Sequence, residues 1–245
     1  MDLKINERID DLELNGLKII QNTKGFCFGI DSILLSDFAK GITSNCSIVD
    51  LGTGTGILPI LLSTKTNAKK IVGIEIQEEV CDMAKRSIKL NNLENKIEII
   101  CENIKNLKNY YNPKTFDHVI TNPPYKELGT GKINLSETKN ISRHEITASL
   151  DDFIEISSYL LKDFGSIFMV HRPDRLVDIL NTLRKYKLEP KIIRFVHPNV
   201  SKPPNLVLIK ATKNAKTFLK VLEPLFVYNE DGNYTTELLK IYNKI

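Results

Sequence analysis

The sequence predicts an α/β fold, built on a mostly parallel sheet with helices on both faces. Two observations lead to this prediction. From about residue 46, apolar segments of strand length alternate with segments that carry apolar residues at helical spacing. The last two strand-like segments, 191–197 and 205–211, are joined by a short proline-bearing loop with no room for a helix, which favours an antiparallel hairpin. We find no repeat or linker and expect a single domain over residues 1–245.

Residues 1–45 are expected to form an extension packed on the core, made of a hairpin and a helix. Two short runs of alternating apolar residues flank Asn15 and Gly16, a pair that suits the two positive-φ positions of a tight hairpin turn. The segment IDSILLSDFAK (30–40) then has apolar residues at i, i+3 and i+4 spacing, which predicts a helix. Asp31 or Ser32 is expected to cap it.

The core elements follow in order along the chain. Before the final hairpin, strands are expected at 47–51, 70–76, 97–101, 116–121 and 166–171. Helices are expected at 57–64, 78–91, 151–161 and 174–186. A polar, glycine-containing stretch of about 25 residues follows Tyr125, and this is too long for a simple connection. We therefore expect a functional loop there.

Composition indicates a reduced, cytoplasmic globular protein. The chain is 42% hydrophobic and 26% charged, and no apolar run approaches the roughly 18–20 residues of a membrane helix. The N-terminal MDLKINERIDD has no apolar stretch of a secretory signal. The four cysteines and four histidines show no metal-ligand spacing or disulfide framework, so we expect no metal.

Charge is distributed unevenly. Residues 162–220 contain 13 Lys and Arg against 4 Asp and Glu, a net charge of +9, whereas the remainder carries −5. This asymmetry indicates either a polyanionic partner on one face or a lysine-rich surface without a specific role. Charge alone does not separate the two interpretations.

A glycine turn follows the first core strand, at the edge where ligands bind in open α/β sheets. Its closely spaced glycines let the backbone approach a ligand. An acidic residue, Glu75, ends the next strand, 25 residues after Asp50, where a carboxylate accepts both hydroxyls of a ribose. A nicotinamide enzyme would use an acid in the same way, so these residues predict only a nucleoside cofactor. The candidate cofactor-binding residues are Asp50, Gly52, Thr53, Gly54, Gly56 and Glu75.

The fourth core strand ends at Asn122-Pro123-Pro124-Tyr125, and this motif indicates the chemistry. An amino group conjugated to an aromatic ring is a poor nucleophile. The Asn122 side-chain oxygen and the Pro123 carbonyl each accept one of its N–H groups, and these bonds strengthen as the nitrogen attacks a methyl donor. Pro123 and Pro124 stiffen the loop, and Tyr125 offers an aromatic face to a flipped base.

With these motifs the sequence resembles the class I S-adenosylmethionine-dependent amino-methyltransferases. The resemblance implies a Rossmann-like class I methyltransferase fold, with a seven-stranded sheet that closes in an antiparallel C-terminal hairpin, and S-adenosyl-L-methionine as cofactor. It places Asn103, where Asp is more usual, beside the adenine of the cofactor. Phe28 and Asp31, in FCFGIDSILL (26–35), match the segment that closes over the methionine end.

More narrowly, the chain resembles the bacterial valine-tRNA adenine-N6-methyltransferase family. The resemblance rests on FGIDSILLSDF, NPPY, SRHE, MVHRPDRL, FVHP and PLFVYNEDGNYTTELLKIY. It implies tRNA as the partner and the 6-amino group of the adenine 3′ of the anticodon as the target. The sequence does not fix the oligomeric state, and a monomer is assumed. Arg143 and His144 are candidates for contacts with RNA. So is Lys126, which directly follows NPPY and is less familiar there.

Three alternatives remain. A glutamine-amide methyltransferase acting on a translation release factor uses the same motif, but has a substantial helical domain before the cofactor residues, where this chain has 49 residues before Asp50. A DNA adenine methyltransferase would be expected to carry a separate target-recognition domain. A catalytically inactive binding protein is disfavoured by the intact NPPY.

Overall fold

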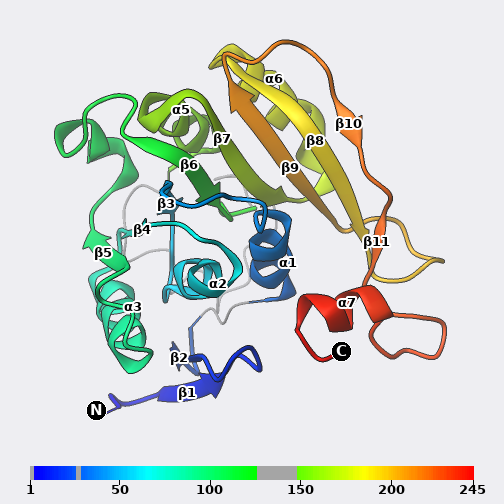
Figure 1. Ribbon diagram of the computed structural model, residues 1–245. Coiled ribbons are helices and arrows are strands. Elements are labelled where there is room, and N and C mark those ends of the chain that lie inside the picture. The colour runs from blue at the N-terminus through cyan, green and yellow to red at the C-terminus, as the bar shows by residue number, and fades with distance from the viewer. Residues whose placement is uncertain (1–2, 26–28, 126–147) are drawn as a thin grey trace.

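The computed structural model describes residues 3–25, 29–125 and 148–245, and it confirms the α/β prediction (Figure 1). The strands of the main sheet are β3 (Ser47–Leu51), β4 (Lys70–Glu75), β5 (Ile97–Cys101), β6 (Phe116–Thr121), β7 (Leu161–His171), β8 (Leu188–His197), β9 (Leu206–Lys213), β10 (Lys220–Val221) and β11 (Leu225–Phe226). The helices are α1 (Ile30–Phe38), α2 (Ile57–Lys65), α3 (Glu78–Leu90), η1 (Ile104–Asn109), α5 (Leu150–Leu160), η2 (Pro173–Arg175), α6 (Leu176–Lys185) and α7 (Thr236–Ile241).

The main sheet has the order β10-β8-β9-β7-β6-β3-β4-β5, and β11 pairs with β8. Seven of these strands form the expected sheet, and the two-residue strands β10 and β11 extend it beyond the prediction. Strand β9 is antiparallel to both β7 and β8, which confirms the C-terminal hairpin. The other strands therefore all end at one side of the sheet, which we call the carboxyl edge.

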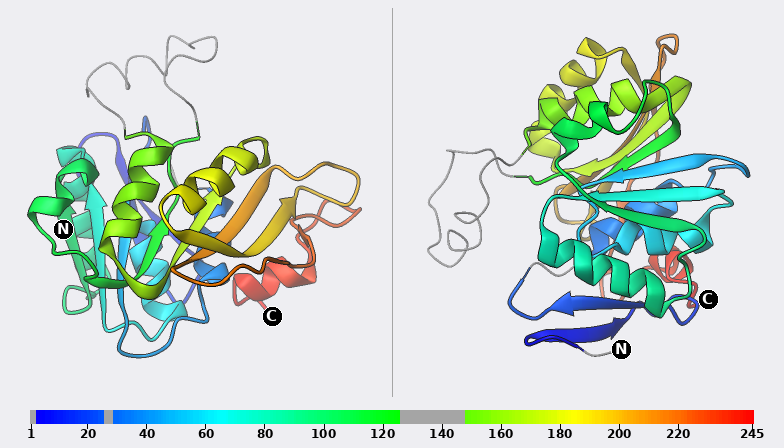
Figure 2. Two further views of the ribbon diagram at one scale, coloured as in Figure 1. Left: turned by 90° about the horizontal axis from the view of Figure 1, so that it is seen from above. Right: turned by 90° about the vertical axis from the view of Figure 1, so that its left-hand side faces the viewer.

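Three layers arise because the strands are apolar on both faces (Figure 2). Successive strand residues point to opposite sides. Ile48 accordingly belongs to the buried cluster that contains α1, α2 and α3, whereas Val49 belongs to the cluster that contains α5 and α6. Both side chains are fully buried. The sheet is thus covered by helices on each face.

Two local predictions need correction. Helix α1 begins after Gly29, which is its N-cap, so neither Asp31 nor Ser32 caps it. A Cβ on Gly29 would lie 2.9 Å from the Asp31 carboxylate, and the glycine leaves room for that side chain inside the first turn. The helix expected at 174–186 is divided into η2 and α6, because Pro173 starts a separate 3-10 turn.

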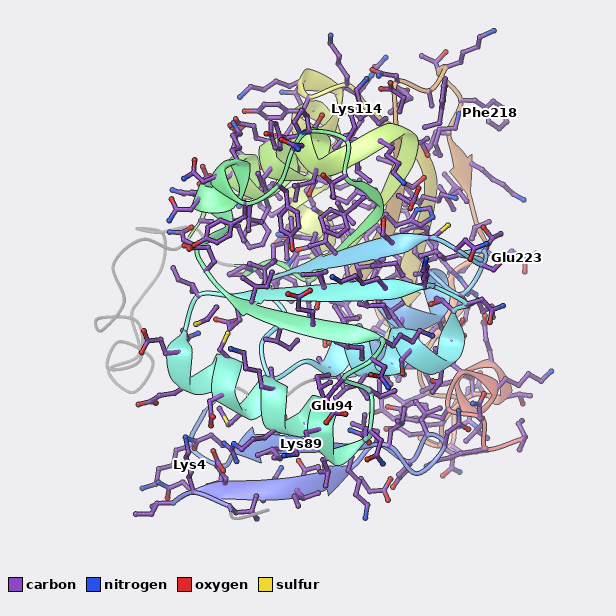
Figure 3. All side chains as sticks on the ribbon, turned by 60° about the vertical axis from the view of Figure 1, so that its left-hand side comes forward. Lys4, Lys89, Glu94, Lys114, Phe218 and Glu223 are labelled. Atoms are coloured by element: carbon purple, nitrogen blue, oxygen red, sulfur yellow. The ribbon has the colours of Figure 1, made fainter. Side chains whose placement is uncertain are left out.

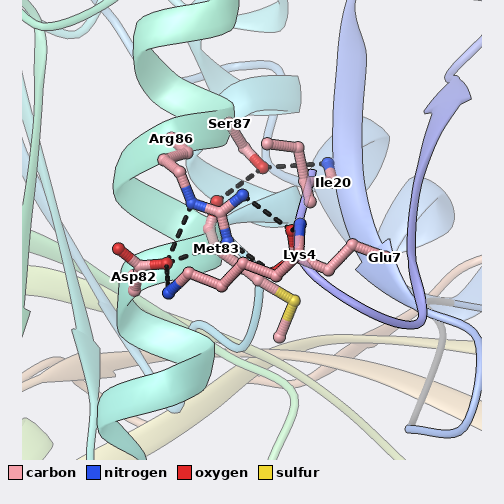
Figure 4. A network of polar contacts seen from close by, with 7 residues as sticks. All are labelled: Lys4, Glu7, Ile20, Asp82, Met83, Arg86 and Ser87. Atoms are coloured by element: carbon pink, nitrogen blue, oxygen red, sulfur yellow. Dashed lines mark hydrogen bonds and ion pairs between the residues drawn. The ribbon is translucent and has the colours of Figure 1, made fainter. Parts of the chain in front are cut away.

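The N-terminal hairpin, β1 (Glu7–Asp11) and β2 (Lys18–Asn22), is confirmed, with Asn15 and Gly16 at φ of 51° and 70° in its turn. It is held against α3 by a network of polar contacts (Figure 4). The Arg86 guanidinium donates to both carboxylate oxygens of Glu7, at 2.8 and 2.5 Å. The Ser87 hydroxyl accepts the Ile20 N–H at 3.0 Å. The hairpin is therefore anchored to the helix that follows β4.

No helix within 3–25, 29–125 and 148–245 is long and apolar enough to cross a membrane. The same residues contain no group of three or more His, Cys, Asp and Glu side chains that could hold a metal ion.

Candidate active site

Neighbouring strand ends bring the predicted residues together at the carboxyl edge. Strands β6, β3, β4 and β5 are adjacent and parallel. Leu51 at the end of β3 pairs with Thr121 of β6 and with Ile74 of β4. The Thr121 hydroxyl also donates to the Leu51 carbonyl at 2.9 Å, which fixes the end of β6 against β3. Asn122, the next residue, therefore lies beside the glycine turn that follows Leu51.

The glycine turn leaves open space at its centre. Gly52, Gly54 and Gly56 have φ of 74°, 58° and 88°, values that disfavour any residue with a Cβ. A Cβ on Gly54 would meet no atom within 4 Å. In contrast, a Cβ on Gly73 of β4 would come within 2.9 Å of the Thr53 side chain, so this glycine makes room for Thr53. Gly73 lies outside the motifs predicted from the sequence.

Glu75 holds the turn in place. One carboxylate oxygen accepts the Gly54 N–H at 3.0 Å and the other accepts the Gln77 N–H at 2.9 Å. Only 6% of the residue is exposed. Because a carboxylate oxygen has two acceptor positions, each oxygen retains one for a ribose hydroxyl.

Asp50 is buried without a partner. Among the described residues, neither of its carboxylate oxygens has a hydrogen-bond partner, and the same holds for the Thr53 hydroxyl. Burial is the main cause that raises the pKa of Asp50 to about 7; the Thr53 hydroxyl, although not in hydrogen-bond geometry, lowers it, and the charge of Glu75 adds to the rise. Buried acceptors without a partner fit a cationic ligand, such as the ammonium and sulfonium groups of the expected cofactor.

Asn103 lies just past β5, on the cofactor side of the edge. It caps η1, and its side-chain oxygen accepts the Lys105 N–H at 3.0 Å. Its backbone N–H donates to Glu102 at 2.8 Å. The side-chain oxygen keeps a second acceptor position, so contact with an adenine stays a prediction.

The geometry at NPPY centres on Asp31. One carboxylate oxygen of Asp31 accepts from the Asn122 side-chain amide and from the Tyr125 hydroxyl, each at 2.9 Å. Since a carboxylate only accepts, the amide must present its NH₂ group to Asp31, which leaves its oxygen for another donor. Pro123 is buried and Pro124 is exposed. Asp31 was expected at the methionine end of the cofactor, and this contact with the acceptor motif was not anticipated.

His171, the last residue of β7, also belongs to this region, although it is not among the site residues predicted from the sequence. It is 2% exposed, and its ring lies 5.1 Å from that of Tyr125, centroid to centroid. Its Nδ1 accepts the Arg172 N–H at 2.8 Å. The pairing of β7 with β6 brings His171 to the acceptor motif, because Thr121 is opposite Met169 and His171 lies two residues further along β7.

Four predicted residues lie outside the described part of the chain. They are Phe28, Lys126, Arg143 and His144.

Comparison with known proteins identifies the family. Residues 29–180 match the methyltransferase small domain. A tRNA1(Val) (adenine(37)-N6)-methyltransferase from Parabacteroides distasonis is 30% identical over 77% of this chain and 78% of its own length. One from Haemophilus influenzae, with the same name, is 24% identical over 91% and 92%.

Solved structures agree on the fold. A predicted O-methyltransferase from Agrobacterium tumefaciens superposes with a TM-score of 0.69 at 20% identity, over 87% of this chain and 95% of its own. A tRNA m1G37 methyltransferase from M. jannaschii gives 0.62 at 20% identity, over 88% and 59%. The chain therefore belongs to the methyltransferase small domain family, within the S-adenosyl-L-methionine-dependent tRNA1(Val) (adenine(37)-N6)-methyltransferases.

Proposed function

We propose that the protein methylates the 6-amino group of adenine 37, 3′ of the anticodon, in a valine tRNA. The names of its relatives support the substrate. The observation that supports the chemistry is the orientation of the Asn122 amide. Its NH₂ group donates to Asp31, which leaves the amide oxygen to accept a hydrogen bond from the substrate. We further propose that residues 1–245 act as a single domain, as a monomer, in the cytoplasm.

The acceptor residues activate the amine. Its lone pair is delocalised into the adenine ring, so attack requires the nitrogen to become tetrahedral. Hydrogen bonds from the two amino N–H groups to the Asn122 side-chain oxygen and the Pro123 carbonyl favour that geometry, and they strengthen in the transition state. Asp31 holds Asn122 before the substrate arrives, so little reorganisation is needed.

Tyr125 and His171 are not set up as bases. Burial, together with the adjacent Asp31 carboxylate, raises the pKa of Tyr125 above its ordinary value, so the phenol stays protonated. Burial lowers the pKa of His171, and its Nδ1 already accepts the Arg172 N–H, so the neutral ring has no free nitrogen to take up a proton. Since the methylated amine loses its proton readily, no base is required. The Tyr125 ring instead offers a face to a flipped adenine, and the buried His171 ring packs against Tyr125.

The cofactor residues define the other half of the site. Bound S-adenosyl-L-methionine supplies an electrophilic methyl group on its sulfonium. Glu75 would accept the ribose hydroxyls, while Asp50 and Thr53 offer their unpartnered oxygens to its cationic end. The glycine turn leaves open space around Gly54.

The test is methyl transfer to unmodified transcripts of valine and non-valine tRNAs, with a labelled methyl donor and mass spectrometry of the product nucleotide. We expect label on adenine 37 of the valine tRNA. Asn122→Ala should lower turnover about 100-fold or more, with nearly unchanged cofactor affinity. Label on all tRNAs equally would refute the valine assignment. Label only in protein or only in DNA would refute the RNA substrate, and near wild-type turnover of Asn122→Ala would refute the mechanism.

A further inference from the structure

Past the acceptor motif, the carboxyl edge of the sheet carries a groove. Beyond His171, at the ends of β7 and β8, lies a groove of about 480 Å³, within the roughly 300–1,000 Å³ of ligand-binding pockets. Its walls come from 172–174, after β7, and from the loop between β8 and β9. We call it the rim groove. It starts one residue after His171, whose ring lies against Tyr125.

The rim groove lies in the basic half of the molecule. Residues 162–220, which carry the net charge of +9, form β7, α6, β8, β9 and β10, all on one side of β6. Within the groove itself Arg172 and Lys202 are exposed cations. Arg172 has an acidic neighbour, Asp174, at 3.4 Å. A groove with two exposed cations in a basic half suits an anionic ligand.

The loop that forms one wall is preformed. Pro198, Pro203 and Pro204 restrict its backbone. The His197 ring donates from Nδ1 to the Lys202 carbonyl at 2.9 Å, because a carbonyl only accepts. The Asn205 N–H donates to the Val196 carbonyl at 3.0 Å and closes the loop at its base. Because this loop is already held in place, little conformational entropy would be lost when a ligand binds against it.

A stack of tyrosines adjoins this wall. Strand β11 runs beside the end of β8, and the Tyr228 N–H donates to the Pro198 carbonyl at 2.8 Å. The ring of Tyr228 stacks on Tyr234, with centroids 5.4 Å apart and planes 27° apart, and Tyr234 stacks on Tyr242 at 5.9 Å and 11°. Tyr228 is the outer ring of the three and is 39% exposed. Figure 1 shows the β8–β9 loop and the segment between β11 and α7 on the same side of the molecule.

We propose that the rim groove and Tyr228 bind the unpaired RNA strand that flanks the target adenine. This inference rests on the proposed function and extends it to the path of the RNA. Lys202 contacts a backbone phosphate, and Tyr228 stacks on a base that flanks the flipped one. Exposed aromatic rings select unstacked bases, whereas paired bases present no free face, so a loop fits this surface and a duplex does not.

The test compares two groove variants with two matched controls. Lys202→Glu removes the proposed phosphate contact, and Lys216→Glu makes the same change in another exposed lysine, beside Lys191 at the opposite end of β8. Tyr228→Ala removes the ring, with Phe218→Ala as its control, because Phe218 is 74% exposed just before β10, which pairs with the start of β8 and not with its end (Figure 3). Each variant is assayed with an anticodon stem-loop RNA for KM, kcat and the salt dependence of binding.

We expect Lys202→Glu to raise KM about tenfold with kcat within about twofold, and to reduce the slope of log affinity against log salt by about one. Tyr228→Ala should raise KM about tenfold, and Tyr228→Phe should restore it, since stacking needs the ring and not the hydroxyl. A 2-aminopurine placed beside the target should lose fluorescence on binding the wild type and Tyr228→Phe, but not Tyr228→Ala.

The outcomes separate the two proposals. If the wild type methylates the RNA but Lys202→Glu and Tyr228→Ala behave like the controls, the groove does not bind RNA while the function stands. If the wild type methylates no RNA, both proposals fail. If label enters a polypeptide and Lys202→Glu reduces that reaction, the groove serves a protein, and the RNA path is refuted.

Discussion

The pH dependence of cofactor binding tests the role of Asp50. This carboxyl is fully buried, both oxygens lack partners among the described residues, and its pKa is raised to about 7. A cationic cofactor is expected to bind the ionised form. Below about pH 7 a proton then competes with S-adenosyl-L-methionine, and affinity should fall about tenfold for each further pH unit. Above about pH 8 it should be constant.

The same burial has a cost in stability. The difference between 3.8 and about 7, at 1.36 kcal/mol for each pK unit, corresponds to roughly 4 kcal/mol as an upper bound. Because the pKa is higher in the folded state, the folded protein binds more protons between these two values, and the free energy of unfolding falls as pH rises through this window. The full cost is present above about pH 7. Asp50→Asn should therefore stabilise the cofactor-free protein at about pH 8, by up to roughly 4 kcal/mol.

Isothermal titration calorimetry from about pH 5.5 to about pH 8.5 measures the affinity, and denaturant unfolding of the cofactor-free protein measures the stability. Asp50→Asn is the control for both, since it should bind weakly with no pH dependence between these limits. An affinity of the wild type that stays constant below pH 7 would refute the ionised-carboxylate contact. A less stable Asp50→Asn at about pH 8 would show that Asp50 is satisfied rather than strained.

The remaining predictions concern the ribose, the acceptor amide and the hairpin. Glu75→Ala should weaken cofactor binding by about 1–3 kcal/mol, and unchanged affinity in calorimetry would remove it from the site. Asp31→Asn leaves Asn122 without its anionic partner, so single-turnover rates should fall about 100-fold; rates within about twofold of the wild type would contradict this. Arg86→Ala should lower the free energy of unfolding by about 1–3 kcal/mol at neutral pH. Arg86 lowers the pKa of Glu7 below 4.5, so the ion pair stabilises the fold above pH 4.5, and this stabilisation is lost as the pH falls through the lowered pKa. Denaturant unfolding of wild type and Arg86→Ala, at neutral pH and in acid below the lowered pKa, measures the loss.

Much of the cofactor half of the site could be predicted from the sequence. The alternation of strands and helices implies parallel strands, and parallel strands end at one edge. Residues at the ends of neighbouring strands, such as Asp50, Glu75 and Asn122, must therefore lie at the same edge. The glycine turn was likewise predictable, because backbone conformations with positive φ favour glycine wherever they occur.

The acceptor half depended on packing. Asp31 and Asn122 are 91 residues apart, and their hydrogen bond forms only because α1 is placed beside the end of β6. His171 lies against Tyr125 only because β7 pairs with β6. Spacing along a chain predicts which residues share an element, but it does not predict which side chains of distant elements meet.

The sequence by itself determined the fold class, the order of the elements, the cofactor turn and the acceptor motif, because each of these is encoded in local residue patterns. Only the tertiary structure decided that Asp31 binds Asn122, that Asp50 is buried without a partner, and that Tyr228 borders a groove beside the site. Those features depend on side-chain direction and solvent exclusion, which arise when separate elements pack together.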